Sequence, residues 1–164
     1  MLRAIKIALI ASVALWGYVG ALGNILDWGG TIGGVFAAAT MSTWEGGADS
    51  WRATDNSILI TLAAVLIVAF KLTSAILCSL GAIAMVRAYG KSDAFDDSKR
   101  LALAGCGVAI LLLFGGWILF AETWFEMWRS EPLRDLSLGS AFRYLGSIAV
   151  IALFVALKDD ERST

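Results

Sequence analysis

The sequence predicts an all-α membrane protein built as a bundle of four transmembrane helices. Hydrophobic residues make up 59% of the chain and charged residues only 16%, with a mean hydropathy of +0.76. Soluble domains carry roughly 45–50% apolar and about 25% charged residues, so this composition is typical of a chain in lipid. The apolar residues gather in four long runs, at about residues 7–22, 57–86, 101–121 and 136–157.

Each run is close to the ~20 residues that cross the hydrocarbon core of a bilayer as a helix. None of them alternates between polar and apolar residues, which is the pattern of a transmembrane β-strand. In lipid, only helices and closed barrels satisfy their own backbone hydrogen bonds. We therefore expect residues 1–164 to form a single domain of four membrane-spanning helices.

The first run follows two basic residues, Arg3 and Lys6, which is also the pattern of a secretory signal peptide. Small residues at Ala21 and Gly23 would suit a cleavage site. We nevertheless interpret this segment as a signal-anchor helix that is retained as the first span.

The distribution of basic residues predicts which ends of the helices face the cytoplasm. If the N-terminus is cytoplasmic, eight basic residues fall on that side of the membrane and three on the other. This bias satisfies the positive-inside rule, so we expect a bacterial inner-membrane protein with both termini in the cytoplasm. The eight are Arg3, Lys6, Arg87, Lys91, Lys99, Arg100, Lys158 and Arg162, and the three are Arg52, Arg129 and Arg134.

The connections between the runs are unequal in length. The first periplasmic loop, residues 23–56, is long, and loops beyond about 12–15 residues are usually functional or disordered. Within it, residues 33–41 are apolar enough to predict a short interfacial helix. The cytoplasmic loop, residues 87–100, is short, and the second periplasmic loop, residues 122–135, carries the only proline.

Most of the tryptophans fall in or beside the two periplasmic loops. Trp prefers the membrane interface because its ring is apolar and its N–H is polar. One interpretation is therefore an aromatic belt at that interface. The other is a cap in which aromatic side chains pack the two loops together and contact a partner. The residues concerned are Trp28, Trp44, Trp51, Trp124 and Trp128.

Several short motifs resemble those of one family of bacterial inner-membrane proteins. In the first periplasmic loop they are Asn24-x-x-Asp27-Trp28, Met41-Ser42-Thr43 and Trp51-Arg52-Ala53. Further along the chain they are Glu122-x-Trp124-Phe125-x-Met127-Trp128 and Ala141-Phe142-Arg143. The family consists of predicted small integral membrane proteins with four transmembrane helices, and the resemblance spans nearly the whole chain in the same order. It implies the fold and the membrane location, and it carries no established activity.

The residue types that most enzymes use are scarce in this chain. The absence of histidine removes imidazole bases, histidine metal ligands and axial histidine ligands for haem. The two cysteines, Cys78 and Cys106, lack a C-x-x-C spacing, and we expect them to be small buried hydrophobes. We therefore expect no catalysis, no metal site and no nucleic-acid partner. No cofactor is predicted, although a bound lipid, quinone or pigment stays open.

Lys71 lies deep within the second predicted span and needs an explanation. It is 16 residues before Arg87, about 24 Å along a helix that rises 1.5 Å per residue. A charge at such a depth costs roughly 2.5–3.5 kcal/mol, so it usually faces a partner, a cavity or a functional path. Three explanations stay open: a carbonyl or hydroxyl partner such as Thr61 or Thr73, an outward shift of the helix, or a partner outside the chain.

Arg143 is the second basic residue inside a predicted span. It lies eight residues after Asp135, about 12 Å into the fourth helix. We expect it to pair with Glu122 or Glu126 at the end of the third helix, which would join the two helices. The alternative is that its long side chain snorkels to the interface.

Small residues form stripes on two of the predicted helices, at Gly17 and Gly20 in the first and at Gly115 and Gly116 in the third. Membrane helices associate through close contact at small residues. We expect these stripes to pack the four helices together. The alternative is that one stripe faces another protein or a flat cofactor.

Two functional hypotheses from different classes follow. In the first, the protein is a non-catalytic accessory or scaffold subunit of a larger integral membrane complex, respiratory or photosynthetic. It would contact membrane lipids, stabilise assembly or shape the access of lipid or quinone. In the second, it is a small transporter or channel component in which Lys71 lines an anion path. A sensor whose long periplasmic loop binds a ligand is a third and less supported hypothesis.

Overall fold

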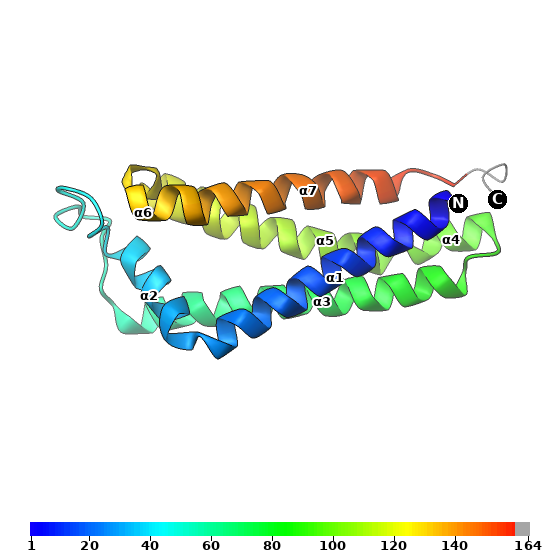
Figure 1. Ribbon diagram of the computed structural model, residues 1–164, viewed down its shortest axis with the longest axis horizontal. Coiled ribbons are helices and arrows are strands. Elements are labelled where there is room, and N and C mark those ends of the chain that lie inside the picture. The colour runs from blue at the N-terminus through cyan, green and yellow to red at the C-terminus, as the bar shows by residue number, and fades with distance from the viewer. Residues whose placement is uncertain (160–164) are drawn as a thin grey trace.

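The computed structural model describes residues 1–159, and these residues form only helices and the turns that connect them. The predicted all-α class is therefore confirmed. Figure 1 shows the long helices running beside one another along one axis of the molecule. In chain order the elements are α1 (Leu2–Leu26), α2 (Trp28–Ala39), α3 (Ser57–Arg87), α4 (Ser92–Ser98), α5 (Arg100–Leu111), η1 (Leu112–Trp124), η2 (Met127–Arg129), α6 (Glu131–Leu133), η3 (Arg134–Leu138) and α7 (Gly139–Ala156).

Four stretches of helix are long and apolar enough to cross a membrane, as the four apolar runs predicted. The second stretch differs from its predicted bounds by a single residue. The others are longer than predicted, because helix continues through the polar and charged residues at their ends. The four are Leu2–Leu26, Ser57–Arg87, Ser92–Trp124 and Glu131–Ala156.

The long first loop contains a helix that packs back against the bundle. This helix, α2, begins five residues before the predicted start at Gly33, because the side chain of Asp27 caps its N-terminus. The capping carboxylate accepts a hydrogen bond from the Gly30 amide at 3.0 Å. In Figure 1, α1 ends short of the adjacent end of α3, and α2 then turns toward that end. The chain therefore makes a corner at Asp27.

The third span changes its helical geometry halfway along. From Leu112 to Trp124 it is π-helical, with hydrogen bonds to carbonyls five residues earlier. The amide of Phe125 donates to the Phe120 carbonyl at 2.9 Å, and the hydroxyl of Thr123 donates to the Ile118 carbonyl at 2.8 Å. Short π-helical segments are rare and occur frequently at functional sites. The 13 residues of η1 therefore indicate that a functional site could lie in this part of the bundle.

The helix α3 lies at the centre and packs closely against α1 and α5. A Cβ added to Gly17 of α1 would lie only 2.8 Å from the carbonyl oxygen of Lys71. A Cβ added to Gly105 of α5 would lie 2.6 Å from the sulfur of Cys78. The hydroxyl of Ser74 also donates to the Gly105 carbonyl at 2.8 Å. By contrast, α3 and η1 have few contacts, so packing is looser toward the start of α3 than at its middle.

The start of α1 and the end of α7 lie at the same end of the molecule as α4 (Figure 1). We name this the terminal end, and we name the opposite end, with the connections at residues 40–56 and 125–130, the loop end. Of the basic residues that predict orientation, Arg162 lies outside the described residues.

Replacement of Gly17 by Ala should destabilise the protein by about 1–3 kcal/mol, because the added methyl group meets the backbone of α3. Gly23→Ala is the matched control in the same helix, since a Cβ there meets no atom within 4 Å. Unfolding free energies in bicelles would compare the two variants. Equal stabilities would show that α1 and α3 do not approach as closely as described.

Candidate functional site

The ammonium group of Lys71 is bound by the end of α1. It donates to the side-chain oxygen of Asn24 at 2.5 Å and lies 3.5 Å from the carbonyl oxygen of Gly20. The carbonyl end of a helix carries a partial negative charge, which favours a cation there. Gly20 leaves room for this arrangement, since a Cβ there would lie 3.4 Å from the lysine nitrogen. Lys71 therefore has its partner within the chain.

The partner of Lys71 differs from the one expected. A carbonyl was among the expected partners, but the hydroxyls of Thr61 and Thr73 do not take this role, and the closest acceptor is the amide oxygen of Asn24. Sequence reasoning missed Asn24 because it lies 47 positions away and was assigned to a loop. The one available signal was the place of Asn24 in the first motif that resembles the family.

Asn24 also fixes the corner between α1 and α2. Its side-chain nitrogen donates to the hydroxyl of Thr31 at 2.9 Å, and that hydroxyl donates to the Asn24 carbonyl at 3.0 Å. Lys71 lies 14 residues after Ser57, about 21 Å along α3 at 1.5 Å per residue. Because Asn24 meets Lys71 there, the corner lies beside the middle of α3, and α2 lies alongside the first half of α3.

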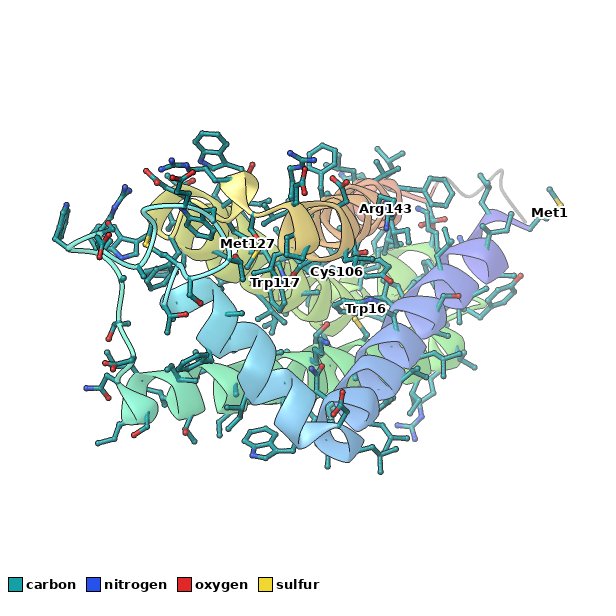
Figure 2. All side chains as sticks on the ribbon, turned by 60° about the vertical axis from the view of Figure 1, so that its left-hand side comes forward. Met1, Trp16, Cys106, Trp117, Met127 and Arg143 are labelled. Carbon is teal, nitrogen blue, oxygen red and sulfur yellow. The ribbon has the colours of Figure 1, made fainter. Side chains whose placement is uncertain are left out.

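A cavity of about 740 Å³ lies between α2, α3 and η1, in the half of the bundle nearer the loop end. Its wall is almost entirely apolar, and it is partly open at the surface. Trp117 and Met127, labelled in Figure 2, both line it and belong to one hydrophobic cluster with Ala38 of α2. Representative lining residues are Gly34 and Ala38 of α2, Ile60 and Ile67 of α3, and Gly116 and Trp117 of η1.

The four glycines predicted to pack helices have two different surroundings. Gly17 and Gly20 lie against α3. Gly115 and Gly116 do not pack against another helix: a Cβ there would meet only Leu111 or Leu112 of the same span, at 3.9 and 3.8 Å. They line the cavity instead. The expectation for this second pair was therefore wrong, because α3 and η1 diverge where these glycines lie.

The two connections at the loop end are joined into one unit, which we name the cap (residues 41–54 and 124–130). The guanidinium of Arg52 forms an ion pair with Glu126, and Arg129 binds the other oxygen of that carboxylate at 3.1 Å. Hydrogen bonds from Arg52 and then from Arg129 lower the pKa of Glu126 below its ordinary value. The hydroxyl of Thr43 donates to that of Ser130 at 2.7 Å.

The predicted aromatic cap forms in part. The rings of Trp51 and Trp124 meet edge to face, with their centroids 5.4 Å apart. Trp51 is 82% exposed and Trp128 is also exposed. Trp44 is half-buried within the first connection, beside Gly47. Trp28 lies at the start of α2, by the corner, and does not belong to the cap.

The expected ion pair between Arg143 and the third span does not form. Arg143 is exposed, and its guanidinium donates to the hydroxyl of Ser140 at 2.9 Å. Glu126 is engaged by Arg52 and Arg129, and Glu122 has no ion pair within the described residues 1–159. The prediction failed because Arg52, 74 residues before Glu126, folds over this end of the bundle.

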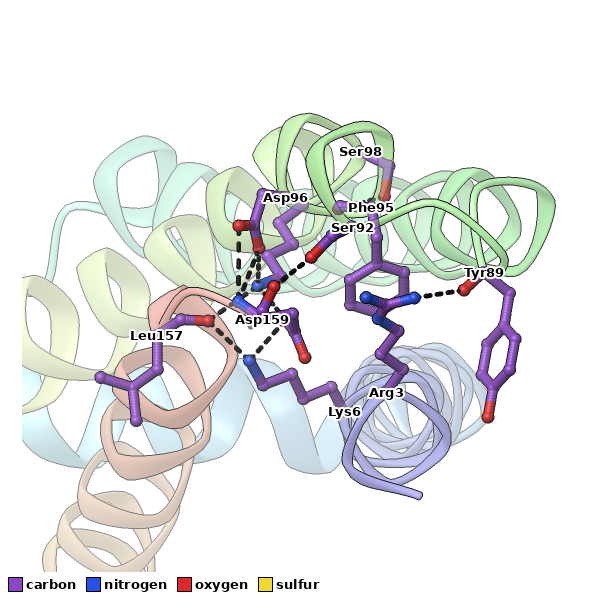
Figure 3. A network of polar contacts seen from close by, with 10 residues as sticks. Arg3, Lys6, Tyr89, Ser92, Phe95, Asp96, Ser98, Leu157 and Asp159 are labelled. Atoms are coloured by element: carbon purple, nitrogen blue, oxygen red, sulfur yellow. Dashed lines mark hydrogen bonds and ion pairs between the residues drawn. The ribbon is translucent and has the colours of Figure 1, made fainter. Parts of the chain in front are cut away.

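A second polar cluster, at the terminal end, joins the segment that follows α7 to α1, to α4 and to the turn between α4 and α5 (Figure 3). One oxygen of Asp159 accepts hydrogen bonds from Lys6 at 2.7 Å and from Lys99 at 2.5 Å. The Leu157 carbonyl accepts from the same two ammonium groups, at 2.6 and 2.8 Å. Asp96 also binds Lys99. The side chains of Asp159, Lys6 and Lys99 are almost fully buried.

The charge on Asp159 is stabilised by its two lysines. Burial alone would raise the pKa of this carboxyl, but the hydrogen bonds from Lys6 and Lys99 outweigh it and hold the pKa below its ordinary value. Nearby, Arg3 donates to the Tyr89 carbonyl at 2.8 Å and lies over the ring of Phe95. Sequence reasoning treated these basic residues only as orientation signals and therefore missed the cluster.

Within residues 1–159, no three His, Cys, Asp or Glu side chains lie close enough to hold a metal ion. Cys78 and Cys106 are buried between α3 and α5 and are free thiols. The apolar cavity beneath the cap has room for another molecule.

Comparison with known families identifies the chain. Residues 2–158 match the model of a family described as "Predicted small integral membrane protein (DUF2165)". The chain belongs to this family. The match agrees with the resemblance carried by the sequence motifs and with the four apolar helices. No curated protein and no solved structure matches the chain.

Two substitutions test the pairing of Lys71 with Asn24. Lys71→Met should destabilise the protein by about 1–3 kcal/mol, because it leaves the amide oxygen of Asn24 without its donor. Asn24→Leu should destabilise it more, since it leaves a charge at a depth where lysine costs roughly 2.5–3.5 kcal/mol. The double variant should be more stable than Asn24→Leu alone. Steric trapping in bicelles would measure all three, and equal effects of the single variants would contradict the pairing.

The Asp159 contacts should persist at neutral pH and be lost in acid. Because the pKa of Asp159 is lowered in the folded protein, its carboxylate stabilises the fold fully at pH values above the ordinary carboxyl pKa of about 3.9. This stabilisation is lost as the pH falls through the lowered pKa. At neutral pH, Asp159→Asn should raise amide exchange at the end of α7. Asp135→Asn, at an exposed carboxylate, is the control. Unchanged exchange in the Asp159 variant would show that this carboxylate does not hold the chain end.

Proposed function

We propose that the protein is a non-catalytic accessory subunit of a larger complex in the bacterial inner membrane, with both termini in the cytoplasm. It would stabilise the assembly or shape the access of lipid or quinone to it. The observation that carries this proposal is the cap, in which two connections distant in sequence are held together and display aromatic side chains. The link between them is the ion pair of Arg52 with Glu126.

The chemistry of the cap suits a contact with another protein. Aromatic residues and arginine are enriched at protein interfaces. Trp51 and Trp128 are exposed, while the backbone that carries them is fixed by Arg52, Glu126 and the pairing of Thr43 with Ser130. A fixed backbone reduces the entropy lost on binding. The cap could thus bind a neighbour without first having to fold.

The transporter hypothesis has less support. A lysine that lines an anion path needs its ammonium group free to meet the anion, but Lys71 is bound to Asn24 and is not part of the cavity wall. Transporters also commonly contain repeats and broken helices around a central site. The corner at Asp27 is such a break, but the cavity beside it is apolar.

Substitution of Trp51 by Ser should weaken association with the host complex while leaving the chain folded, because this side chain is exposed and packs edge to face on Trp124 in the cap. The measurement is purification from the native membrane in mild detergent, with native mass and proteomics read from one sample. Tyr89→Ser, at an exposed aromatic residue of the terminal end, is the control and should leave association unchanged.

The same purification of the wild-type protein tests whether it is a subunit of a larger complex. A large stoichiometric assembly would support it and identify the host complex. A lone four-helix particle, or an oligomer of this chain alone, would contradict it and would turn attention to solute flux in Lys71→Met.

A further inference from the structure

We propose that the cavity between α2, α3 and η1 binds one hydrocarbon tail of a membrane phospholipid, with the head group outside the cavity. This inference rests on the proposed function, because it names the molecule whose access the subunit would shape. The cavity lies between helices that have the length and composition of membrane spans, so lipid tails are the medium around it.

The polar groups on the cavity wall already have partners in the protein. Asn24 and Thr31 bind each other, and Asn24 also accepts from Lys71. The hydroxyl of Ser137 accepts from the indole of Trp117 at 2.9 Å. The hydroxyl of Thr54 accepts from the amide of Asn56 at 3.3 Å. A polar head group placed inside would lose its contacts with water and find few replacements, which disfavours it.

The size of the cavity fits a single chain of this kind. An apolar cavity of about 150 Å³ binds benzene, and this one, at about 740 Å³, is roughly five times as large. A helix from another protein is a poor fit. Because a helix is about 10–12 Å across, the same volume would hold no more than about two turns of it.

Glycines on opposite walls create the space. Gly34 of α2 has no atom within 4 Å of the position that a Cβ would take, and at Gly116 of η1 only Leu112 of its own span lies that near. Larger side chains at these two positions would therefore extend into the cavity without first displacing the backbone. A tail in the cavity would fill volume that otherwise leaves apolar walls without packing partners.

The experiment uses the full chain in vesicles of phosphatidylethanolamine and phosphatidylglycerol. One preparation contains a phosphatidylethanolamine with a photoactivatable diazirine at the end of one tail, and another carries the diazirine on the head group. After illumination, mass spectrometry of peptides locates the cross-links. We expect the tail probe, and not the head-group probe, to label the cavity-lining residues within 30–39 and 111–121.

Cavity-filling variants give the second measurement. Gly34→Leu and Gly116→Leu, made separately, should each remove most of the tail labelling at the opposite wall. Gly146→Leu is the matched control: it makes the same change in a membrane-spanning helix, has no atom within 4 Å of the new Cβ, and does not line the cavity. It should leave the labelling unchanged, and wild-type labelling remains informative even if one variant fails to fold.

Two results would overturn the inference. One is tail labelling spread evenly over all lipid-facing helices and unchanged by either cavity-filling variant. The other is stronger labelling of the cavity by a quinone that carries its photoactivatable group on the ring, which would show that a head group enters. Because the protein is tested alone in vesicles, these results are distinguishable from a failure to find a host complex, which concerns the proposed function.

Discussion

The bond between Lys71 and Asn24 is the constraint on which the loop-end half of the structure depends. It holds the end of α1 against the middle of α3, about 21 Å from the start of α3 at 1.5 Å per residue. A lysine at this depth needs an acceptor, and an asparagine at the end of a helix supplies one together with the favourable end of the helix dipole. Asn24 then binds Thr31 and so sets the direction in which α2 leaves the corner. Without this bond, the corner would lose its anchor on α3, and with it the contact that positions α2 over the cavity.

The two halves of the bundle use small residues in opposite ways. Around the middle, Gly17 and Gly105 bring α1 and α5 against the backbone of α3, and Ser74 adds a hydrogen bond. This is the usual means by which helices associate in lipid, where no hydrophobic force drives them together. Toward the loop end, Gly115 and Gly116 have no helix against them. There, small side chains leave a space that packing does not fill. The same residue type thus gives close contact where helices converge and a cavity where they diverge.

The sequence predicts the spans well because their signal is local. Ser57–Arg87 lies within one residue of the prediction, since an apolar run that contains a single charge, Lys71, extends from Asn56 to Arg87. The start of α2 was missed because Gly29 and Gly30 weaken a helical pattern, while the cap from Asp27 compensates. The partners of Lys71, Arg143 and Asp159 depend on which helices meet and at what height. The spacing of residues along the chain does not tell at which level along the bundle two helices meet. The predicted pairing of Arg143 with Glu122 or Glu126 failed for this reason. The cavity glycines failed for the same reason.

The cap and the cavity are physically continuous, which connects the two proposals. Phe125 and Met127 belong to the cap and also line the cavity, and Thr54 does so from the first connection. Glu126, between them, has a left-handed backbone with φ of 48°, a conformation that costs a non-glycine residue about 1–3 kcal/mol and needs surrounding contacts to persist. Arg52 and Arg129 supply those contacts. A neighbour that binds Trp51 and Trp124 would therefore lie against residues 125–127, the short segment that closes the cavity. Conversely, a tail that packs against Met127 would contact the segment that carries the aromatic pair. Occupation of the cavity and binding at the cap therefore act on the same backbone segment, which the ion pairs of Glu126 hold in place.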